Sequence, residues 1–385
     1  MRLNFSTFIA AFPLAIWLYL FLARGNFWRV RVDAIVPQRL DRWPKVVAIV
    51  PARNEAETIA ATIASVAQQD YPGMFSIVVV DDHSDDSTAA LARQAADDSS
   101  LPRCVTIVSA APLPPGWTGK VWALKEGIRA AAEQAPDFYW FTDADITHAP
   151  DTLRRLVFRA EQESLDLTSF MVMLRTKTVP ERFLIPAFLF FFLMLYPPRW
   201  IANPNKRTAG AAGGCILLRC SALERIGGLR TICSEVIDDC ALARAVKKSG
   251  GRIWMGLTRV SLSLRGFDTV AQIRDMIART AFTQLRHSFL LLLATLFGLF
   301  VTYLLAWVLF LELNKPAWLL AGIAISLMTA TYSATVRFYG LSPLWAATLP
   351  IAAIFYGYAT CLSAVRYWLG RGGQWKGRAQ ASGSA

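Results

Sequence analysis

Three pairs of neighbouring carboxylates stand out in a chain whose formal net charge is +12. Each pair follows an apolar run or begins a helical pattern: Asp81 and Asp82, Asp143 and Asp145, and Asp238 and Asp239. Carboxylates this close repel each other unless something positive lies between them. Asp is also common in turns and at helix N-termini. The pairs therefore indicate either local caps or a site that binds a cation.

The pair in FTDADITHAP suits a metal ion best. An Asp-x-Asp pair at the end of a strand can bind a divalent cation through its oxygen atoms. Such a cation can neutralise a diphosphate and stabilise it as a leaving group. Asp143 and Asp145 are therefore candidates for a site that binds a hard divalent cation, although a short acidic triplet alone is a weak signal.

Two further residues have types that suit phosphate chemistry. Lys120, in GWTGKVWALKEG, begins a helix where it could reach a phosphate beside the helix N-terminus, or remain a solvated surface lysine. Asp239 could accept a proton from an attacking hydroxyl group, or only place charge in the first turn of a helix. No metal-ligand spacing links the histidines, which we expect to be structural: His83, His148 and His287.

The segments around these residues alternate between strand and helix. Apolar runs predict strands, separated by helical patterns, at 46–50, 75–80, 104–108 and 138–142, with helices at 55–68, 87–96 and 120–134. This alternation predicts an α/β fold with a mostly parallel sheet covered on both faces. Ligands bind such sheets beyond the carboxyl ends of the strands, so we expect the acidic pairs to converge there.

Long apolar segments flank the globular region. Hydrophobic residues make up 54% of the chain, which indicates that part of it lies in lipid. Residues 5–23 lack charge and lead into an arginine-rich stretch rather than a cleavage site, so we expect a retained membrane helix and not a signal peptide. About three more transmembrane helices are expected within 288–365. The apolar block 183–198 is either a core helix or a helix in the membrane interface.

Basic residues predict the orientation in the membrane. Arg24, Arg29 and Arg286 flank the globular segment 46–287, which predicts that this segment is cytoplasmic. Four crossings would then leave the tail outside, yet the tail is basic. One C-terminal segment could therefore be re-entrant or interfacial, and the sequence leaves this open. The basic residues cluster beside apolar segments and show no zinc-finger spacing, which favours a membrane partner over nucleic acid.

The ordered motifs resemble a known family. VVAIVPARNEAETIAATIASVAQQDYP, SIVVVDDHSDD, GKVWALKEG, FTDAD, AAGGCILLRCSALERIGG and EVIDDCALARAV are similar to those of inverting family 2 glycosyltransferases of GT-A fold, over roughly residues 46–287. GWTGKVWAL, TDADITHAP and ARTAFTQLRHS further resemble the bacterial hopene-associated glycosyltransferases. The resemblance implies a Rossmann-like domain on a multi-pass protein of the bacterial inner membrane.

The resemblance also implies roles for single residues. Those that match donor-binding positions are Pro51, Glu55, Asp82, Lys120 and Asp143. Asp145 matches the metal ligand of the DxD motif, with Mg²⁺ or Mn²⁺ as the cofactor. Asp239 matches the general base.

The implied reaction is a single-step, inverting hexosyl transfer from a nucleotide sugar, expected to be UDP-linked, to the hydroxyl group of a membrane lipid such as a hopanoid. Processive members often carry QxxRW, whereas this chain reads IARTAFTQLRHS, in which Arg279, Gln284 and Arg286 could supply related contacts. This departure favours one transfer over a processive polysaccharide synthase. A membrane sensor that binds nucleotide sugar without catalysis is the alternative from another class, and it would not need Asp239.

Overall fold

The computed structural model describes residues 5–98, 104–312, 315–372, 374–375 and 378–379. The chain divides into two compact units. The sheet unit comprises Arg31–Arg175 and Trp200–Gly266, with the terminal Gly373–Ala385. The helical unit comprises Met1–Val30, Thr176–Arg199 and Phe267–Gly372. The expected continuous domain over 46–287 is thus interrupted in sequence by a segment of the helical unit.

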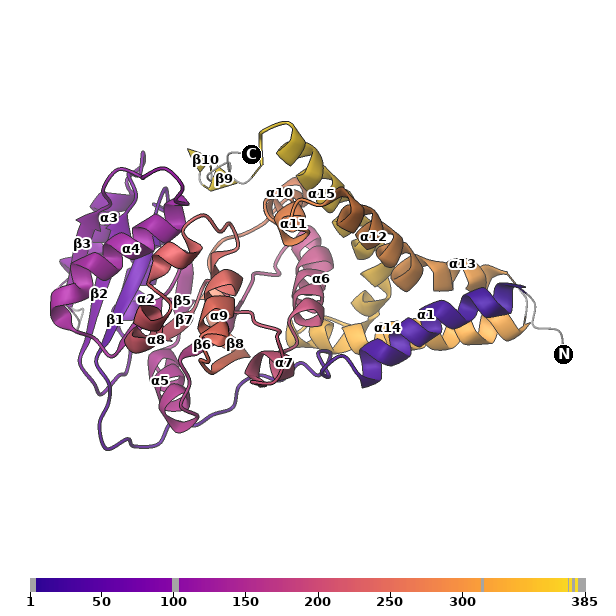
Figure 1. The fold of residues 1–385 in the computed structure, drawn as a ribbon, viewed down its shortest axis with the longest axis horizontal. Helices are drawn as coiled ribbons and strands as arrows, with labels where there is room; N and C mark the ends of the chain where they lie inside the picture. The colour runs from indigo at the N-terminus through magenta and orange to yellow at the C-terminus, as the bar shows by residue number, and fades with distance from the viewer. Residues whose placement is uncertain (1–4, 99–103, 313–314, 373, 376–377, 380–385) are drawn as a thin grey trace. The chain divides into compact units, whose positions relative to one another are not determined.

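An eight-stranded sheet with the order β3-β2-β1-β4-β7-β6-β8-β5 forms the sheet unit (Figure 1). Its strands are β1 (Val46–Ala52), β2 (Phe75–Asp81), β3 (Cys104–Ser109), β4 (Phe138–Phe141), β5 (Ile146–His148), β6 (Leu167–Met173), β7 (Ile216–Arg219) and β8 (Ile253–Ser263). The half β3-β2-β1-β4 is parallel, as the sequence predicts. The other half is mixed, because β7 runs antiparallel to β4 and β6, and β5 runs antiparallel to β8. The expectation of a mostly parallel sheet therefore describes only the first half.

Helices accompany the strands in the expected alternation. The main ones are α2 (Ile59–Ala67), α3 (Thr88–Ala96), α4 (Gly119–Ala131), α5 (Thr152–Gln162) and α9 (Asp238–Lys248), with the shorter α7 (Pro198–Ala202) and α8 (Cys220–Arg225). Helix α2 begins four residues later than the sequence pattern suggests. The reason is that the backbone N–H of Asn54 donates to Ser84 in the loop after β2, and that of Glu55 donates to Thr88 at the beginning of α3, which holds this segment outside the helix.

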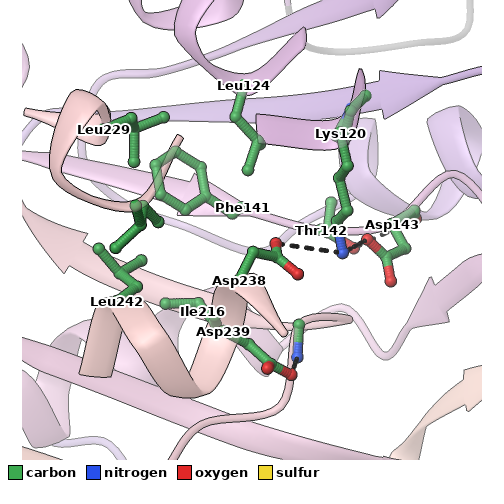
Figure 2. Close-up of a pocket in the computed structure, with 13 residues that line it drawn as sticks. Lys120, Leu124, Phe141, Thr142, Asp143, Ile216, Leu229, Asp238, Asp239 and Leu242 are labelled. Atoms are coloured by element: carbon green, nitrogen blue, oxygen red, sulfur yellow. Dashed lines mark hydrogen bonds and ion pairs between the residues drawn. The ribbon is translucent and has the colours of Figure 1, made fainter. Parts of the chain in front are cut away.

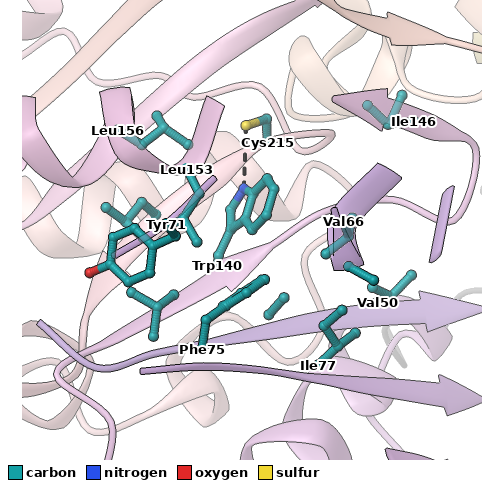
Figure 3. Packing of buried hydrophobic residues seen from close by; sticks show 14 of the residues in the cluster. Val50, Val66, Tyr71, Phe75, Ile77, Trp140, Ile146, Leu153, Leu156 and Cys215 are labelled. Atoms are coloured by element: carbon teal, nitrogen blue, oxygen red, sulfur yellow. Dashed lines mark hydrogen bonds between the residues drawn. The ribbon is translucent and has the colours of Figure 1, made fainter. Parts of the chain in front are cut away.

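The core of the sheet unit packs around a buried tryptophan. Trp140 and Phe138 on β4 have no exposed surface, and every residue of β1 is buried. Trp140 Nε1 donates to Cys215 Sγ at 3.4 Å, so the buried indole N–H has a partner (Figure 3). This core fixes β4 beside β7 and thereby positions the loop that follows β4.

The helical unit contains the apolar segments. Its elements are α1 (Phe5–Leu22), α6 (Val179–Leu195), α10 (Val270–Ala278), α11 (Ala281–Gln284), α12 (Phe289–Leu299), α13 (Leu305–Leu311), α14 (Lys315–Phe338) and α15 (Leu349–Trp368). A π-helical turn joins α12 to α13. Five segments of the described chain are long and apolar enough to cross a membrane: Phe5–Leu22, Val179–Ala202, Phe289–Leu311, Lys315–Phe338 and Pro343–Trp368. The block expected at 183–198 is therefore an apolar helix grouped with these segments rather than a core helix of the sheet unit.

Three of these segments lie side by side. Ala10 in the first half of α1 packs with Ala317 at the beginning of α14 and with Leu309 at the end of α13. Further along α1, Trp17 Nε1 donates to the carbonyl of Thr302 at 2.8 Å. Helices α1 and α14 therefore run in the same direction, and α12–α13 runs in the opposite direction (Figure 1).

The end of α15 returns to the beginning of α12. Ala364 packs with Leu292, and the ring of Trp368 lies 6.1 Å from that of Phe289. Arg366 of α15 forms an ion pair with Asp275 of α10 at 2.7 Å. The last turn of α15 and the first turn of α12 therefore lie at the same end of the helical unit.

Candidate active site

The predicted acids gather where neighbouring strands end. β1 pairs in parallel with β2 on one side and with β4 on the other, so their carboxyl ends share one edge of the sheet. Asp82 follows β2, and the loop with Asp143 and Asp145 follows β4. Because β7 is antiparallel to β4, its amino end, preceded by Gly213, reaches the same edge.

The loop between β4 and β5 is held by hydroxyl groups from α2 and its preceding turn. The carbonyl of Ala144 accepts hydrogen bonds from Thr58 Oγ1 at 3.0 Å and Thr62 Oγ1 at 2.9 Å. Both donors reach the residue between the two acids. The acids are therefore left to project from a fixed backbone, which is what a preorganised site requires.

A buried histidine links the beginning of this loop to β8 through hydrogen bonds. His148 Nε2 lies 2.8 Å from Thr142 Oγ1, and its Nδ1 lies 2.9 Å from Ser261 Oγ on β8. Burial lowers the pKa of His148 to about 3, so the ring is neutral at physiological pH. This agrees with the structural role expected for the residue.

Lys120 lies among three carboxylates. Its Nζ is 2.7 Å from Asp143 Oδ1 and 3.8 Å from Asp238 Oδ2 (Figure 2). Burial alone would lower the pKa of Lys120, but Asp143, Asp238 and Asp239 raise it, so the amine stays charged. Lys120 therefore links Asp143, in the loop after β4, to Asp238 at the beginning of α9. It is not the solvated surface lysine of the alternative interpretation.

Asp239 is held in one orientation by backbone donors. Its Oδ2 accepts the N–H of Gly213 at 2.9 Å, and its Oδ1 accepts the N–H of Cys240 at 2.6 Å. Burial and the charge of Asp238 raise the pKa of Asp239 to about 6, although Lys120 opposes the shift. A carboxylate with this pKa is ionised at neutral pH and can still accept a proton.

Gly213 leaves the space that these groups occupy. A Cβ atom built on Gly213 would lie 3.0 Å from Lys120 Nζ and 3.4 Å from Asp239 Oδ2. A side chain here would therefore press on both charged groups. The pocket between them also has an apolar wall, whose members are Leu124, Phe141, Ile216, Leu229, Ile232 and Leu242.

The second acid of the loop pairs with an arginine that the sequence analysis did not identify. Arg265 Nε donates to Asp145 Oδ2 at 2.8 Å, and its Nη2 donates to Glu55 Oε1 at 2.6 Å. Burial and Asp143 raise the pKa of Asp145, and Arg265 opposes this shift. The positive charge that the acids require is thus supplied in part by the chain itself, through Lys120 and Arg265.

Most of the predicted site residues come together. Four of them line the pocket of Figure 2: Pro51, Lys120, Asp143 and Asp239. Glu55 and Asp145 meet at Arg265. Asp82 is fully buried at the end of β2, and its carbonyl accepts Arg53 Nη1 at 2.5 Å, but it is not part of the pocket lining as far as the structure describes it.

The residues considered in place of QxxRW belong to the helical unit. They are Arg279, Gln284 and Arg286. Gln284 Nε2 donates to Tyr196 Oη at 2.7 Å, a contact that links α11 to the end of α6. This contact gives Gln284 a role in packing within that unit.

Comparison with known proteins agrees with this geometry. Residues 47–227 match the family model described as glycosyl transferase family 2. The matched segment makes up just under half of the chain. The match runs from β1 to β7 and contains Lys120, Asp143 and Asp145. Asp239 and Arg265 lie beyond its end.

Two curated relatives carry related names. An N-acetylglucosaminyltransferase of Mesorhizobium japonicum is 28% identical over 187 residues, which cover 48% of this chain and 39% of the relative. A probable glycosyltransferase of Bacillus subtilis, YdaM, is 27% identical over 218 residues, which cover 54% of this chain and 50% of the relative. The chain thus spans half or less of the length of these glycosyltransferases.

A solved structure shares the fold beyond the family 2 domain. A mannosyltransferase of Pyrobaculum calidifontis, in complex with GDP-Man and Mn²⁺, aligns with a TM-score of 0.56 and 20% identity. The alignment covers 95% of this chain and 99% of that one. The similarity in fold therefore extends to the apolar helices.

The carboxylates of the loop after β4 fit a metal ion that binds together with a phosphate ligand. Among the described residues, no three His, Cys, Asp or Glu side chains are close enough to hold a metal by themselves. Mg²⁺ and similar ions are often bound by one or two carboxylates together with substrate phosphates and water. Asp143 and Asp145 provide such a partial set of oxygen ligands.

Proposed function

We propose that the protein is an inverting glycosyltransferase that transfers one sugar from a nucleotide-sugar donor to a hydroxyl group of a membrane lipid. The observation that carries this proposal is the position of Asp239. It lies beside Lys120 in the pocket at the edge of the sheet, oriented by two backbone N–H groups and with a pKa of about 6.

In the proposed reaction Asp239 removes the proton of the acceptor hydroxyl while that oxygen attacks the anomeric carbon. The new bond forms on the face opposite the leaving group, and the bond to the nucleoside diphosphate breaks with its electron pair on the phosphate oxygen. Lys120 offsets negative charge around the pocket throughout. A divalent cation held by Asp145 and Asp143 would supply Lewis-acid stabilisation of the diphosphate when bound.

The donor and the cofactor are proposed on chemical grounds and by similarity. The P. calidifontis mannosyltransferase was solved with GDP-Man and Mn²⁺, and the M. japonicum relative is an N-acetylglucosaminyltransferase. These proteins support a nucleotide sugar and a divalent cation. We retain a UDP-sugar as the first donor to test, with GDP-sugars beside it, and a hopanoid as the first lipid acceptor.

Attachment to the membrane is proposed through three crossings, although five segments have the required length. Segment α6 cannot cross once, because the chain before it enters β6 and the chain after it enters β7, and these strands pair in one sheet. Both ends of α6 must therefore be on the same side. A helix that dips into the membrane interface satisfies this condition.

Segment α15 also makes no net crossing in this proposal. The chain leaves the sheet unit, passes through α10 and α11 into α12, crosses through α12–α13, and returns through α14. The end of α15 then lies beside the first turn of α12, on the side from which the chain left. Three crossings, by α1, α12–α13 and α14, place the tail on the side of the sheet unit. This arrangement resolves the conflict between four crossings and a basic tail.

Two reporters test this topology. A C-terminal fluorescent-protein fusion should be fluorescent and a phosphatase fusion inactive, because the tail is proposed to be cytoplasmic. A cysteine introduced as Ser342→Cys, in a background without native cysteines, should resist a membrane-impermeant maleimide in intact cells. An active phosphatase fusion would support four crossings, and labelling of position 342 would contradict the proposed return of the chain through α14.

The activity is tested with purified full-length protein, Mn²⁺, a panel of UDP- and GDP-sugars and native lipid extract, followed by mass spectrometry of the lipids. We expect products that carry one added sugar. Asp239→Asn should lower turnover by about 10²- to 10⁴-fold, the usual contribution of a general base, and leave donor affinity nearly unchanged. Glu235→Gln, an exposed acid nearby in sequence, is the matched control and should retain activity.

Each result separates the alternatives. Products with long sugar chains would indicate a processive synthase. Donor binding without any turnover by the wild-type protein would indicate a sensor. Near-normal turnover by Asp239→Asn would remove its role as the base, and full activity in excess chelator would remove the metal ion from the proposal.

A further inference from the structure

Arg265 joins two carboxylates that come from distant parts of the chain. Its ion pairs reach Asp145, 120 residues away in sequence, and Glu55, 210 residues away. The side chains of Asp145 and Glu55 are 14% and 13% exposed, whereas that of Arg265 is 37% exposed. The guanidinium group therefore approaches the two acids from the solvent side.

The backbone at Arg265 is fixed while its side chain is not enclosed. Leu264 N donates to the carbonyl of Asp145 at 2.8 Å, and Ser263 pairs with Ile146 at the end of β8. The base of the arginine is therefore anchored next to the metal-ligand candidate. A long side chain anchored in this way can exchange one anionic partner for another without movement of the sheet.

A metal ion and Arg265 compete for Asp145. The guanidinium group donates to Asp145 Oδ2, one of the oxygens that a cation would use. A metal ion bound to Asp145 would also repel the guanidinium group of Arg265, because both would be positively charged and bound to the same carboxylate. Binding of metal alone must therefore break the ion pair with Asp145 and leave the guanidinium group short of one anion, with Glu55 as its remaining carboxylate partner. A diphosphate provides one, because guanidinium groups bind phosphate through two parallel hydrogen bonds.

We propose that Arg265 is an internal counter-ion that holds Asp145 and Glu55 before the donor binds and moves to the donor diphosphate when the metal ion takes Asp145. Metal and donor binding thereby become mutually dependent. This inference rests on the proposed function, since it requires a diphosphate donor and a divalent cation. It adds a donor-binding residue that lies outside the matched family segment.

The proposal has a thermodynamic signature. If nucleotide strengthens Mn²⁺ binding by a given factor, Mn²⁺ must strengthen nucleotide binding by the same factor. In the wild-type protein this factor contains two contributions, the direct contact between metal and phosphate and the release of Asp145 by Arg265. Arg265→Gln removes the second contribution. Mn²⁺ alone should then bind more tightly, and the coupling factor should fall.

The test measures Mn²⁺ binding by the loss of the free-ion signal in electron paramagnetic resonance, with and without UDP or GDP, on full-length protein. Without nucleotide, we expect Arg265→Gln to bind Mn²⁺ about tenfold more tightly than the wild-type protein, within the range usual for coupled sites. With nucleotide present, the coupling factor should be about tenfold smaller than in the wild-type protein. Arg265→Lys keeps the charge but cannot form bidentate hydrogen bonds. It should therefore give a Mn²⁺ affinity and a coupling factor between those of the wild-type protein and Arg265→Gln.

Arg225→Gln is the matched control. Arg225 also pairs with a partly buried acid, Asp166, at 3.0 Å with a side chain 40% exposed, and it lies outside the pocket. The substitution Arg225→Gln changes the net charge by the same amount as Arg265→Gln, and it should leave Mn²⁺ binding unchanged. In the double variant Arg265→Gln/Asp145→Asn the gain in Mn²⁺ affinity should disappear.

Unchanged or weaker Mn²⁺ binding by a folded Arg265→Gln would overturn the proposal, provided that wild-type protein binds Mn²⁺ with nucleotide. Equal tightening in Arg225→Gln would also overturn it, because the effect would then be one of net charge. If wild-type protein bound no Mn²⁺ even with nucleotide, the metal-dependent part of the proposed function would fail, and this inference with it.

Discussion

The acid–base behaviour of Asp239 should shift in a predictable direction when its neighbour loses its charge. Asp238→Asn keeps the size of the side chain and removes the like charge that, after burial, contributes most to the raised pKa of about 6. Two carboxylates on the order of 6 Å apart interact by ~3 kcal/mol at an effective dielectric constant of about 20. Lys120, 3.8 Å from Asp238, offsets much of this repulsion, so we expect the pKa of Asp239 to fall by about one unit.

The measurement is the pH dependence of kcat/KM, followed by release of nucleoside diphosphate with native lipid as acceptor. The base must be deprotonated, so activity rises as the pH increases through its pKa. In Asp238→Asn this rise should move from about pH 6 to about pH 5, and at pH 5 the fraction of plateau activity should increase about fivefold. Lys120→Met should move the rise in the opposite direction, because it removes a charge that stabilises the carboxylate. A rise that stays at one pH in both variants would refute the assignment of Asp239 as the titrating base.

Three other changes test the packing around the site. Gly213→Ala should lower kcat/KM by about tenfold to a hundredfold with little change in melting temperature, because the new Cβ would press on Lys120 and Asp239; normal kinetics would contradict this. Trp140→Ala should reduce the free energy of unfolding by about 3–5 kcal/mol, measured by denaturation followed through fluorescence, because it leaves a cavity in the core. As the pH falls below about 6.5, the unfolded chain protonates His148 while the folded protein, with a pKa of about 3, does not, so stability falls by up to ~1.4 kcal/mol per pH unit. His148→Gln should show a shallower loss over the same range, and an identical slope would argue against a buried neutral ring.

The parallel half of the sheet was predictable because its strands are short apolar runs, two of which, β2 and β4, lead into acidic residues. The other half was not. β7 has only four residues and runs antiparallel, and no local pattern shows strand direction. β8 alternates between buried and exposed residues over part of its length, which a search for continuous apolar runs overlooks.

The site was partly predictable for a similar reason. Asp143, Asp239 and Lys120 occur in recognisable motifs at the ends of elements. Arg265 stands alone in SLSLRGFD, and its partners are far away in sequence, so only the fold brings the three groups together. The helical unit shows the same limit. Length and hydropathy identify segments that can cross a membrane, but whether α6 crosses depends on the pairing of β6 with β7 on either side of it.

The insertion of α6 between β6 and β7 has a consequence for how the chain could be separated from lipid under the proposed membrane attachment. Removal of the apolar segments near the two termini would still leave the apolar helix α6 between two strands of the sheet unit. Under that attachment no single proteolytic cut can release an intact sheet unit from the membrane, and a water-soluble version would require a designed linker in place of residues 176–199.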